Sequence, residues 1–486
     1  MNKDSAAERI VSVILIILLA VSFVLLMFPC IYAMKGLDYI IPDGYVFKYI
    51  GIQMTKGQMP YLDVFDHKGP LLYVINFLGV IINRDFGIII VEAIFNIVSI
   101  VLLCIIPLRI GCSKMQALFT ALIATLFYIS VFKPGNYVEE FALPFILASY
   151  LIFIDYFKHD MINTKRLIIN GACFGAVIML RPNMACLWIV FCIAVLIKCI
   201  RTKEYKTIGG FLWKFIAGCC IIVAPLVIWL AAKGALKACY EQFILFNLKY
   251  SDSDAILRSY AMMDMLQLPY FSVVFVVSVL LIVILYRKKQ SIPVIFFPFA
   301  LYFIFQSILF VMAGTFYDHY CITAVPFIVY PLSELLIALD DTKKKNIWLG
   351  LIALSLIAVS CVRLERTFVY LRYYLNGKYA MTQEVSDLID CVKQNTNENS
   401  KITMFGNWDY MYIATDRESA TIYTYAKPII YLSREVYDDY FAKLNETHPD
   451  VLVLEFSNED IEKFIQNNSY SIIYESENYT ALKKGE

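Results

Sequence analysis

The chain has 486 residues, of which 60% are apolar and 17% are charged. A soluble globular domain is about 45–50% apolar and about 25% charged, so the composition excludes a single soluble domain. The formal net charge of +1 combines two unlike parts. Residues 1–363 carry 30 Lys and Arg against 21 Asp and Glu, whereas residues 364–486 carry 12 against 20. Opposite charges on the two parts indicate two different environments.

Eleven apolar runs, separated by polar segments, follow one another through residues 1–363. The first, residues 10–33, contains no charged residue and is long enough to cross a bilayer as a helix. It exceeds the roughly 7–15 residues of a signal-peptide core. The other runs are residues 86–108, 115–132, 141–157, 167–180, 184–200, 215–232, 268–286, 292–313, 320–339 and 347–363. They predict an α-helical polytopic membrane protein with about 11 transmembrane helices, of which 167–180 is the shortest.

A further apolar stretch, residues 70–83, is interpreted as a helix lying flat on the outer membrane surface. With that assignment the predicted inner loops hold 18 Lys and Arg in 53 residues, and the outer segments hold 11 in 104. This excess follows the positive-inside rule. It predicts a multi-pass plasma-membrane protein of bacterial type, with a cytoplasmic N-terminus and a first outer loop at residues 34–85. A twelfth span at 70–83 would instead place the basic runs 287–289 and 343–345 outside.

Residues 364–486 contain no spanning run and alternate helix-like with strand-like segments. This pattern predicts a small soluble α/β domain, here extracytoplasmic, after a membrane domain of residues 1–363. Its acidic charge gives no indication of nucleic-acid binding. The 13 cysteines of the chain fall mostly in apolar runs and form no CxxC motif, so neither a disulfide framework nor a thiolate metal site is predicted.

Polar chemistry is concentrated in the first outer loop. The segment DGYVFKYIGIQMTKG predicts an amphipathic surface helix with Asp43 near its N-terminus, where the helix dipole stabilises a carboxylate. The segment PYLDVFDHKGPL then brings acids, an imidazole and an ammonium to the same boundary: Asp63, Asp66, His67 and Lys68. An acid, a base and a phosphate-binding cation would all be available there. Solvated loop charge is the alternative interpretation on composition alone.

This loop resembles that of the GT-C glycosyltransferases, in the branch of the protein O-mannosyltransferases and bacterial aminoarabinose transferases. Members of that family are polytopic, use a polyprenyl- or dolichyl-phosphate sugar donor and invert the anomeric centre. They place a catalytic Asp at the start of the first outer loop and follow it with a Lys-Pro-Pro-Leu element. Asp43 matches the Asp, and Lys68-Gly69-Pro70-Leu71 matches the second element with Gly69 in place of the first Pro. Gly44 follows Asp43, so a second acid of the usual pair comes from elsewhere or is not required.

Polar residues at three other outer positions are expected to join this site. Glu139 and Glu140 precede the run 141–157, where they could equally complement the helix dipole. Arg181 occupies a short outer turn and could either snorkel to the surface or hold a lipid phosphate through paired hydrogen bonds. The segment TFYDHYC supplies three more candidates at another outer mouth: Tyr317, Asp318 and His319.

The resemblance implies an inverting transfer of a sugar from a polyprenyl phosphate to an acceptor at the outer face of the membrane. Asp43, as general base, and Asp66 are the expected catalytic residues. Four side chains are expected to bind the donor phosphate: Lys68, Arg181, His67 and His319. Five are expected to bind substrate: Asp63, Glu139, Glu140, Tyr317 and Asp318. No metal ligands are predicted. No cofactor is required, because polyprenyl phosphate is a competent leaving group, and the use of a divalent metal ion is left open. The partners are the lipid-linked donor, the membrane and an unspecified glycan, lipid or protein acceptor.

Two other function classes share this membrane setting. A transporter or lipid flippase would often show an internal repeat and polar residues near the bilayer midplane, whereas this chain shows no repeat and clusters its polar residues at one face. A surface-polysaccharide polymerase or ligase would carry Arg and His in a large central outer loop. The corresponding loop, residues 233–267, contains one Arg, Arg258, and no His.

Overall fold

The computed structural model describes residues 14, 16–25, 42–132, 135–250, 254–340, 375–376, 382–407, 409–426 and 433–485. Of the predicted run 10–33 it describes an apolar helix at Ile16–Leu25. The predicted run 347–363 lies outside the described residues, as does the proposed boundary between residues 363 and 364. The division into domains 1–363 and 364–486 therefore stays a prediction.

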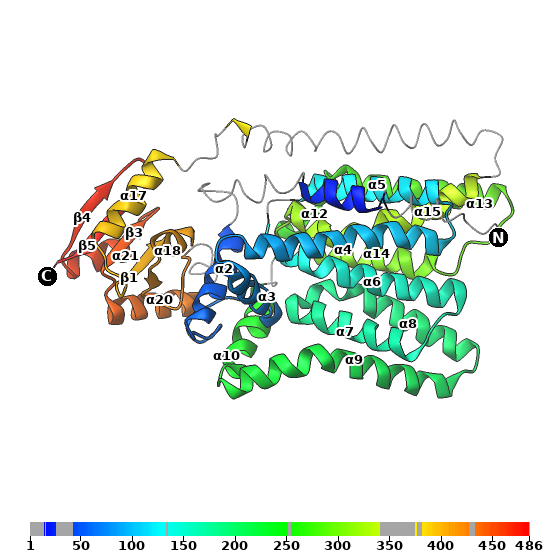
Figure 1. The fold of residues 1–486 in the computed structure, drawn as a ribbon, viewed down its shortest axis with the longest axis horizontal. Helices are drawn as coiled ribbons and strands as arrows, with labels where there is room; N and C mark the ends of the chain where they lie inside the picture. Colours follow the sequence, from blue (N-terminus) through cyan, green and yellow to red (C-terminus); the bar gives the residue numbers. More distant parts are fainter. Residues whose placement is uncertain are drawn as a thin grey trace.

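A bundle of helices forms the larger part of the molecule (Figure 1). Its members are α4 (Gly87–Ile110), α5 (Lys114–Val131), α6 (Val138–His159), α7 (Thr164–Leu180), α8 (Cys186–Arg201), α9 (Tyr205–Ala232), α13 (Pro269–Arg287), α14 (Phe296–Val311) and α15 (Pro326–Leu339). Helix α6 is the most enclosed of the span-length helices, packing against α4, α7 and the 3₁₀-helix η3 (Asp318–Ala324). Its first turn, with Glu139 and Glu140, is therefore held in a fixed place.

Among the described residues, five helices are long and apolar enough to cross a membrane, namely α4, α5, α6, α9 and α13. The pair η3 and α15, bent by 47° at the break, makes a sixth if it forms one span. Helices α7, α8 and α14 have 17, 16 and 16 residues and are shorter. A mostly helical protein with several candidate spans is thus confirmed, whereas the described residues do not establish the predicted count of eleven.

Local sequence signals set several helix ends. The Ser113 side chain accepts from the Gln116 amide while the Gln116 side chain accepts from the Ser113 amide, a capping box that begins α5. Asn163 accepts a hydrogen bond from the Arg166 amide at the start of α7. The shortest predicted run is a tightly packed element, because a Cβ at Gly171 of α7 would collide with the Phe215 carbonyl of α9. Small residues of this kind let membrane helices approach closely.

The two helices of the first outer loop lie between one end of the bundle and the C-terminal sheet (Figure 1). They are α2 (Pro42–Thr55) and α3 (Pro70–Ile82), both at predicted positions. Helix α3 has 13 residues, too few to span a bilayer. Helix α2 differs from the predicted surface helix, because among its described side chains only Thr55 is exposed. It is covered by α3 and by α18 (Tyr410–Thr415) of the C-terminal part.

Four helical segments follow α9 in the predicted outer segment 233–267. They are α10 (Leu236–Cys239), the π-helix η2 (Tyr240–Phe246), α11 (Asn247–Tyr250) and α12 (Ala255–Leu266).

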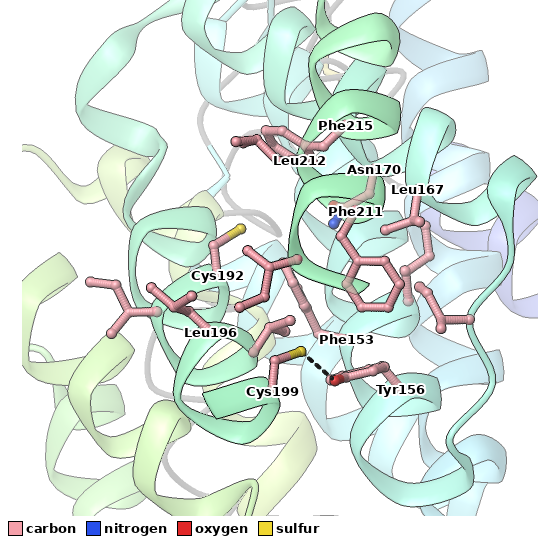
Figure 2. Close-up of a pocket in the computed structure, with 15 residues that line it drawn as sticks. Phe153, Tyr156, Leu167, Asn170, Cys192, Leu196, Cys199, Phe211, Leu212 and Phe215 are labelled. Carbon is pink, nitrogen blue, oxygen red and sulfur yellow. Dashed lines mark hydrogen bonds between the residues drawn. The ribbon is translucent and has the colours of Figure 1, made fainter. Parts of the chain in front are cut away.

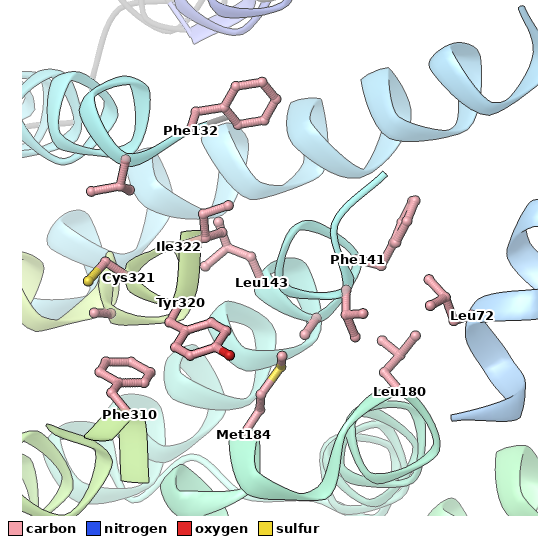
Figure 3. Packing of buried hydrophobic residues seen from close by; sticks show 14 of the residues in the cluster. Leu72, Phe132, Phe141, Leu143, Leu180, Met184, Phe310, Tyr320, Cys321 and Ile322 are labelled. Atoms are coloured by element: carbon pink, nitrogen blue, oxygen red, sulfur yellow. The ribbon is translucent and has the colours of Figure 1, made fainter. Parts of the chain in front are cut away.

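Leu72 of α3, Phe141 of α6 and Leu180 of α7 lie together in the buried core (Figure 3). This apolar contact joins the first outer loop to the two bundle helices that carry Glu139 and Arg181.

The C-terminal part contains a five-stranded sheet in the order β2-β1-β3-β5-β4. Its strands are β1 (Lys401–Phe405), β2 (Glu418–Ser419), β3 (Val451–Leu454), β4 (Tyr470–Glu475) and β5 (Thr480–Lys484). Strands β2, β1 and β3 are parallel, while β5 and β4 pair antiparallel. The other helices of this part are α17 (Gln383–Gln394), α20 (Arg434–Thr447) and α21 (Glu459–Asn467). The predicted alternation of helices and strands is therefore present.

Candidate active site

The loop between α2 and α3 makes a tight turn before the Asp-His-Lys sequence. Tyr61 adopts a left-handed conformation, with φ of 71°, and its amide donates to the Val64 carbonyl at 2.9 Å. Asp63 is exposed and accepts a hydrogen bond from the Met59 amide at 2.6 Å. Asp63, a predicted substrate ligand, thus shapes the turn in this structure, and its contact with substrate stays a prediction.

Lys68 is tied to the end of α7 by its neighbour Gly69. The Gly69 amide donates to the Leu180 carbonyl at 3.0 Å, and a Cβ at Gly69 would overlap the Met179 carbonyl oxygen. Proline, which the resembling family has at this place, lacks the amide hydrogen that this contact uses. The glycine that departs from the Lys-Pro-Pro-Leu pattern therefore has a physical reason. Its contact with the end of α7 brings Lys68 close to Arg181.

Asp66 is buried and held from three directions. Its Oδ2 accepts a hydrogen bond from the Tyr73 hydroxyl at 2.8 Å, and its Oδ1 accepts one from the Tyr425 hydroxyl at 3.0 Å. Its amide donates to Oε1 of Gln242, in the π-helix η2, at 3.2 Å. Burial raises the pKa of Asp66 and the charge of Asp43 adds to this, while the Lys68 charge and the Tyr73 hydrogen bond oppose it. With both oxygens engaged, Asp66 is suited to positioning its neighbours.

His67 lies between Asp66 and Lys68. Its Nε2 is 2.7 Å from Nζ of Lys68, and its Nδ1 is 3.4 Å from Oδ1 of Asp66. Burial lowers the pKa of His67 well below its ordinary value of 6.5, and the positive charges of Lys68 and Arg181 lower it further. The imidazole is therefore neutral at neutral pH, and the cationic groups near it are Lys68 and Arg181.

Arg181 is anchored at the end of α7 by two partners. Its Nη1 lies 2.7 Å from Oε1 of Glu139, and its guanidinium sits 4.6 Å from the centre of the Tyr320 ring. Glu139, predicted to bind substrate, is thus the ion-pair partner of Arg181. Glu140 is fully buried, and its Oε1 accepts a hydrogen bond from the Tyr137 amide at 3.3 Å.

The segment around His319 lies beside Arg181. The His319 ring stacks on Tyr137, with 4.2 Å between ring centres, and lies 5.5 Å from the ring of Tyr317. Tyr317 is exposed and Asp318 half-buried. The structure therefore brings these three predicted residues to the same end of the bundle as Arg181, while their contacts with donor or substrate stay predictions.

Asp43 lies in the first turn of α2, as predicted. The start of this helix is anchored because the Asn136 amide group donates to the Gly44 carbonyl at 2.9 Å and exchanges hydrogen bonds with Asn76. The charge of Asp43 helps to raise the pKa of both Asp66 and Asp409. Asp43 therefore shares one electrostatic environment with the Asp66-His67-Lys68 sequence.

The sequence did not assign Asp409 to the site. This residue precedes α18 and is fully buried. Neither of its carboxylate oxygens has a hydrogen-bond partner within the described part of the chain, although the Thr424 hydroxyl is nearby. Burial raises the pKa of Asp409 to about 7; the charges of Asp66 and Asp43 act in the same direction and Thr424 opposes them. Asp409 is therefore a further buried acid whose electrostatic environment includes Asp43 and Asp66.

Other residues missed from the sequence come from distant segments. Tyr425 and Asp409 belong to Tyr-rich stretches of the C-terminal part, whose composition is equally typical of a small packed core. Gln242 and Asn247 follow α10, where Gln242 donates to the Tyr61 carbonyl at 2.7 Å and Asn247 to the His67 carbonyl at 2.6 Å. The presence of a π-helix at functional sites is common, but no sequence pattern indicated it here.

The structure therefore gathers a polar cluster at one end of the bundle, which we call the loop-end site: Asp43, Asp66, His67, Lys68, Glu139, Arg181 and Asp409. Among the described residues, no three His, Cys, Asp or Glu side chains are close enough together to hold a metal ion.

An apolar cavity of about 380 Å³ lies elsewhere, between α6, α7, α8 and α9 (Figure 2). Phe153 and Tyr156 of α6 line it, together with Asn170, Cys192 and Phe211. Phe153 is 14 residues beyond Glu139 on α6, about 20 Å along a helix. The cavity is therefore separate from the loop-end site.

Comparisons with known proteins agree with this architecture. A family described as "Putative competence-induced protein Ccs4 N-terminal domain" matches residues 4–348. The chain is similar to the crystal structure of ArnT from Cupriavidus metallidurans bound to undecaprenyl phosphate. The alignment covers 98% of this chain and 98% of the ArnT chain, with 11% identity and a TM-score of 0.61. The apo structure of the same protein also covers 98% of both chains, with 12% identity and a TM-score of 0.64. ArnT is an aminoarabinose transferase of the GT-C superfamily, so the chain has the fold that the resemblance implied. No curated protein matches the chain in sequence.

Proposed function

The chain belongs to the family of the putative competence-induced protein Ccs4 N-terminal domain, and we propose that it is an inverting glycosyltransferase. It would move a sugar from a polyprenyl-phosphate donor to an acceptor at the outer face of a plasma membrane. The ArnT structure with bound undecaprenyl phosphate supports this class of donor.

One observation carries the proposal: a carboxylate and two cations lie in the same loop-end site. Asp43 acts electrostatically on Asp66, and Asp66 adjoins His67, which experiences the charges of both Lys68 and Arg181. Transfer from a lipid phosphate needs a base for the acceptor and positive charge for the leaving group. Cations at a water-poor boundary stabilise such a developing anion more strongly than they would in water.

In the proposed reaction the acceptor hydroxyl oxygen attacks the anomeric carbon while Asp43 takes the hydroxyl proton. The bond between that carbon and the phosphate oxygen breaks, and its electron pair leaves with polyprenyl phosphate. Lys68 and Arg181 stabilise the phosphate as it departs. Asp66 and the neutral His67 position Lys68, and the base role falls to Asp43 alone. The result is inversion, because the attack comes from the face opposite to the leaving group.

The proposal is tested with purified protein and a panel of polyprenyl-phosphate sugars, by measuring the release of free polyprenyl phosphate and the appearance of glycosylated acceptor. Asp43→Asn is expected to lower the transfer rate by about 100-fold or more, the usual size of a general-base contribution. Asp85→Asn is the matched control, because Asp85 is an exposed acid at the same end of the molecule.

The control variant should transfer sugar at the wild-type rate. If Asp43→Asn is as active as the wild type, Asp43 is not the base. If the wild type releases no polyprenyl phosphate from any donor of the panel, the protein is not this class of transferase, and transport or flipping of a lipid becomes the better hypothesis.

A further inference from the structure

Residues 409–426, here called the docking segment, lie against the first outer loop. The Phe65 amide donates to the Ile422 carbonyl at 2.7 Å, and the Ser419 amide donates to the Tyr49 hydroxyl at 2.9 Å. Arg84 forms an ion pair with Asp416 at 2.6 Å. Main-chain and side-chain contacts thus fix this part of the C-terminal region to the elements that carry the loop-end site.

Tyr425 of the docking segment begins a continuous line of contacts that ends at Lys68. Its hydroxyl donates to Oδ1 of Asp66 at 3.0 Å. The same Oδ1 lies 3.4 Å from Nδ1 of His67, and Nε2 of His67 lies 2.7 Å from Nζ of Lys68. Four side chains from two distant parts of the sequence are therefore connected in order.

The protonation states along this line are determined by chemistry. The Lys68 ammonium can only donate, so Nε2 of His67 must accept, and the ring proton of the neutral imidazole is on Nδ1. That nitrogen lies 3.4 Å from Oδ1 of the Asp66 carboxylate, within the range of an electrostatic contact. The negative charge of Asp66 therefore favours this orientation of the imidazole, whose Nε2 in turn holds the Lys68 ammonium at 2.7 Å.

Tyr425 determines how well the Asp66 carboxylate can orient the His67 imidazole. The two oxygens of the buried Asp66 side chain are each fixed by one phenol, Tyr73 on Oδ2 and Tyr425 on Oδ1. Without the Tyr425 hydroxyl, Oδ1 of Asp66 would lose the side-chain hydrogen bond that fixes it in a buried place. A buried acceptor left without a donor is costly, so the carboxylate is expected to rotate away from the imidazole.

We propose that Tyr425 is a positioning residue of the donor site, which holds the Lys68 ammonium for the donor phosphate by way of Asp66 and His67. The inference rests on the proposed function, since it takes Lys68 to be the phosphate ligand. It makes the C-terminal region part of the donor site in addition to any part that it has in acceptor choice.

The test compares Tyr425→Phe with Tyr423→Phe in the full-length protein. Tyr423 is a matched control on the same segment, because its hydroxyl donates to Asp439 of the C-terminal part at 2.7 Å. Undecaprenyl phosphate is the binding probe, and donor KM, acceptor KM and kcat are measured where transfer is observed. Tyr425→Phe is expected to weaken undecaprenyl phosphate binding and to raise the donor KM, each by about tenfold. Acceptor KM and kcat should stay within about twofold of the wild type.

A second comparison separates positioning from general destabilisation. In a Lys68→Ala background, Tyr425→Phe should have no further effect on undecaprenyl phosphate binding, because the group that it positions is gone. If Tyr425→Phe does not yield folded protein, Tyr73→Phe removes the other phenol from Asp66 and should weaken binding in the same way.

The outcomes are distinguishable. A wild-type protein that does not bind undecaprenyl phosphate contradicts the proposed function. If the wild-type protein binds undecaprenyl phosphate but Tyr425→Phe binds it equally tightly, only the inference is overturned. Equal losses in Tyr425→Phe and Tyr423→Phe, or an undiminished effect of Tyr425→Phe in the Lys68→Ala background, also overturn it.

Discussion

Nη1 of Arg181 lies 2.7 Å from Oε1 of Glu139, which joins the end of α7 to the first turn of α6 by a partly buried ion pair. The Tyr320 ring covers the guanidinium on another side, 4.6 Å from its centre. The arginine is thus held in place by the protein itself, so in its proposed role a donor phosphate would meet a side chain that is already ordered.

Glu139→Gln is expected to destabilise the protein. The substitution leaves the partly exposed Arg181 charge beside a neutral amide in place of its carboxylate. Breaking a fully buried pair costs about 3–5 kcal/mol, so the loss of stability expected here is smaller than that. The melting temperature of the detergent-purified protein measures this effect. Glu241→Gln is the control, because Glu241 forms an exposed pair with Lys237, and such surface pairs contribute about 1 kcal/mol or less. Equal melting temperatures for Glu139→Gln and the wild type would show that the pair contributes nothing to stability.

Arg181→Ala is expected to raise the donor KM by about tenfold or more, because the phosphate loses a charge-assisted donor. The acceptor KM should change less, since the acceptor is expected to lie toward Asp43. Steady-state kinetics with each substrate varied in turn provide the measurement. Arg434→Ala, which removes an exposed arginine of α20, should leave both constants as they are. An unchanged donor KM in Arg181→Ala would remove this residue from the phosphate site.

Gly69→Ala is expected to lower both the melting temperature and the transfer rate. The added Cβ would overlap the Met179 carbonyl and lie 2.7 Å from the Leu180 carbonyl oxygen, so the backbone before Lys68 must move. Even a displacement of about 1 Å in a site of this kind can cost about 100-fold in rate. Gly209→Ala is the control, because nothing lies within 4 Å of a Cβ there. Alanine in that helix should be neutral or stabilising by up to about 1 kcal/mol. Wild-type activity in Gly69→Ala would refute the close-packing argument.

Asp409→Asn is expected to change how stability depends on pH. The pKa of Asp409 is raised by burial from 3.8 to about 7 in the folded protein. Between about pH 4 and pH 7 the folded state therefore holds a proton that the unfolded state has released. Stability must fall as the pH rises through this window.

Asparagine carries no charge at either end of the window, so Asp409→Asn should lack this loss. Its melting temperature relative to the wild type is expected to be higher at pH 8 than at pH 5. Asp438→Asn, at an exposed position in α20, should show no such trend. Parallel pH profiles for Asp409→Asn and the wild type would mean that Asp409 titrates normally.

Hydrophobic periodicity and local signals predicted much of the fold. Helices α4 to α8 lie within a few residues of the apolar runs, because length and apolarity are local properties of the sequence. Helix α9 begins at Tyr205, ten residues before the predicted run 215–232. Helix α2 begins at Pro42 with Asp43 in its first turn, as expected. The same local signals failed for the environment of α2, which is packed beneath the C-terminal part, since coverage by a distant segment leaves no periodic mark on the helix that it covers.

The residues of the candidate site also divide into those that the sequence indicated and those that it did not. Asp43 and Lys68 could be selected because they match the Asp and the Lys-Pro-Pro-Leu element of the resembling family. Arg181 could be selected because it lies in a short turn between two apolar runs, where a cation can hold a phosphate. The partners of Asp66 could not be selected from the sequence. Gln242 and Tyr425 lie 176 and 359 residues away from Asp66 in sequence. A tyrosine or a glutamine does not stand out in the composition, and only a contact at about 3 Å gives it a role.

The sequence by itself determined that this is a multi-pass membrane protein, because the length and apolarity of each run are readable along the chain. Through the family resemblance it also predicted that the chemistry lies in the loop of residues 34–85. Only the tertiary structure decided which side chains share the site with that loop. It paired Glu139 with Arg181, brought Gly69 against the end of α7, and placed Tyr425 on Asp66. These are contacts between segments whose approach depends on the packing of the whole bundle and the C-terminal part, and no local pattern encodes that packing.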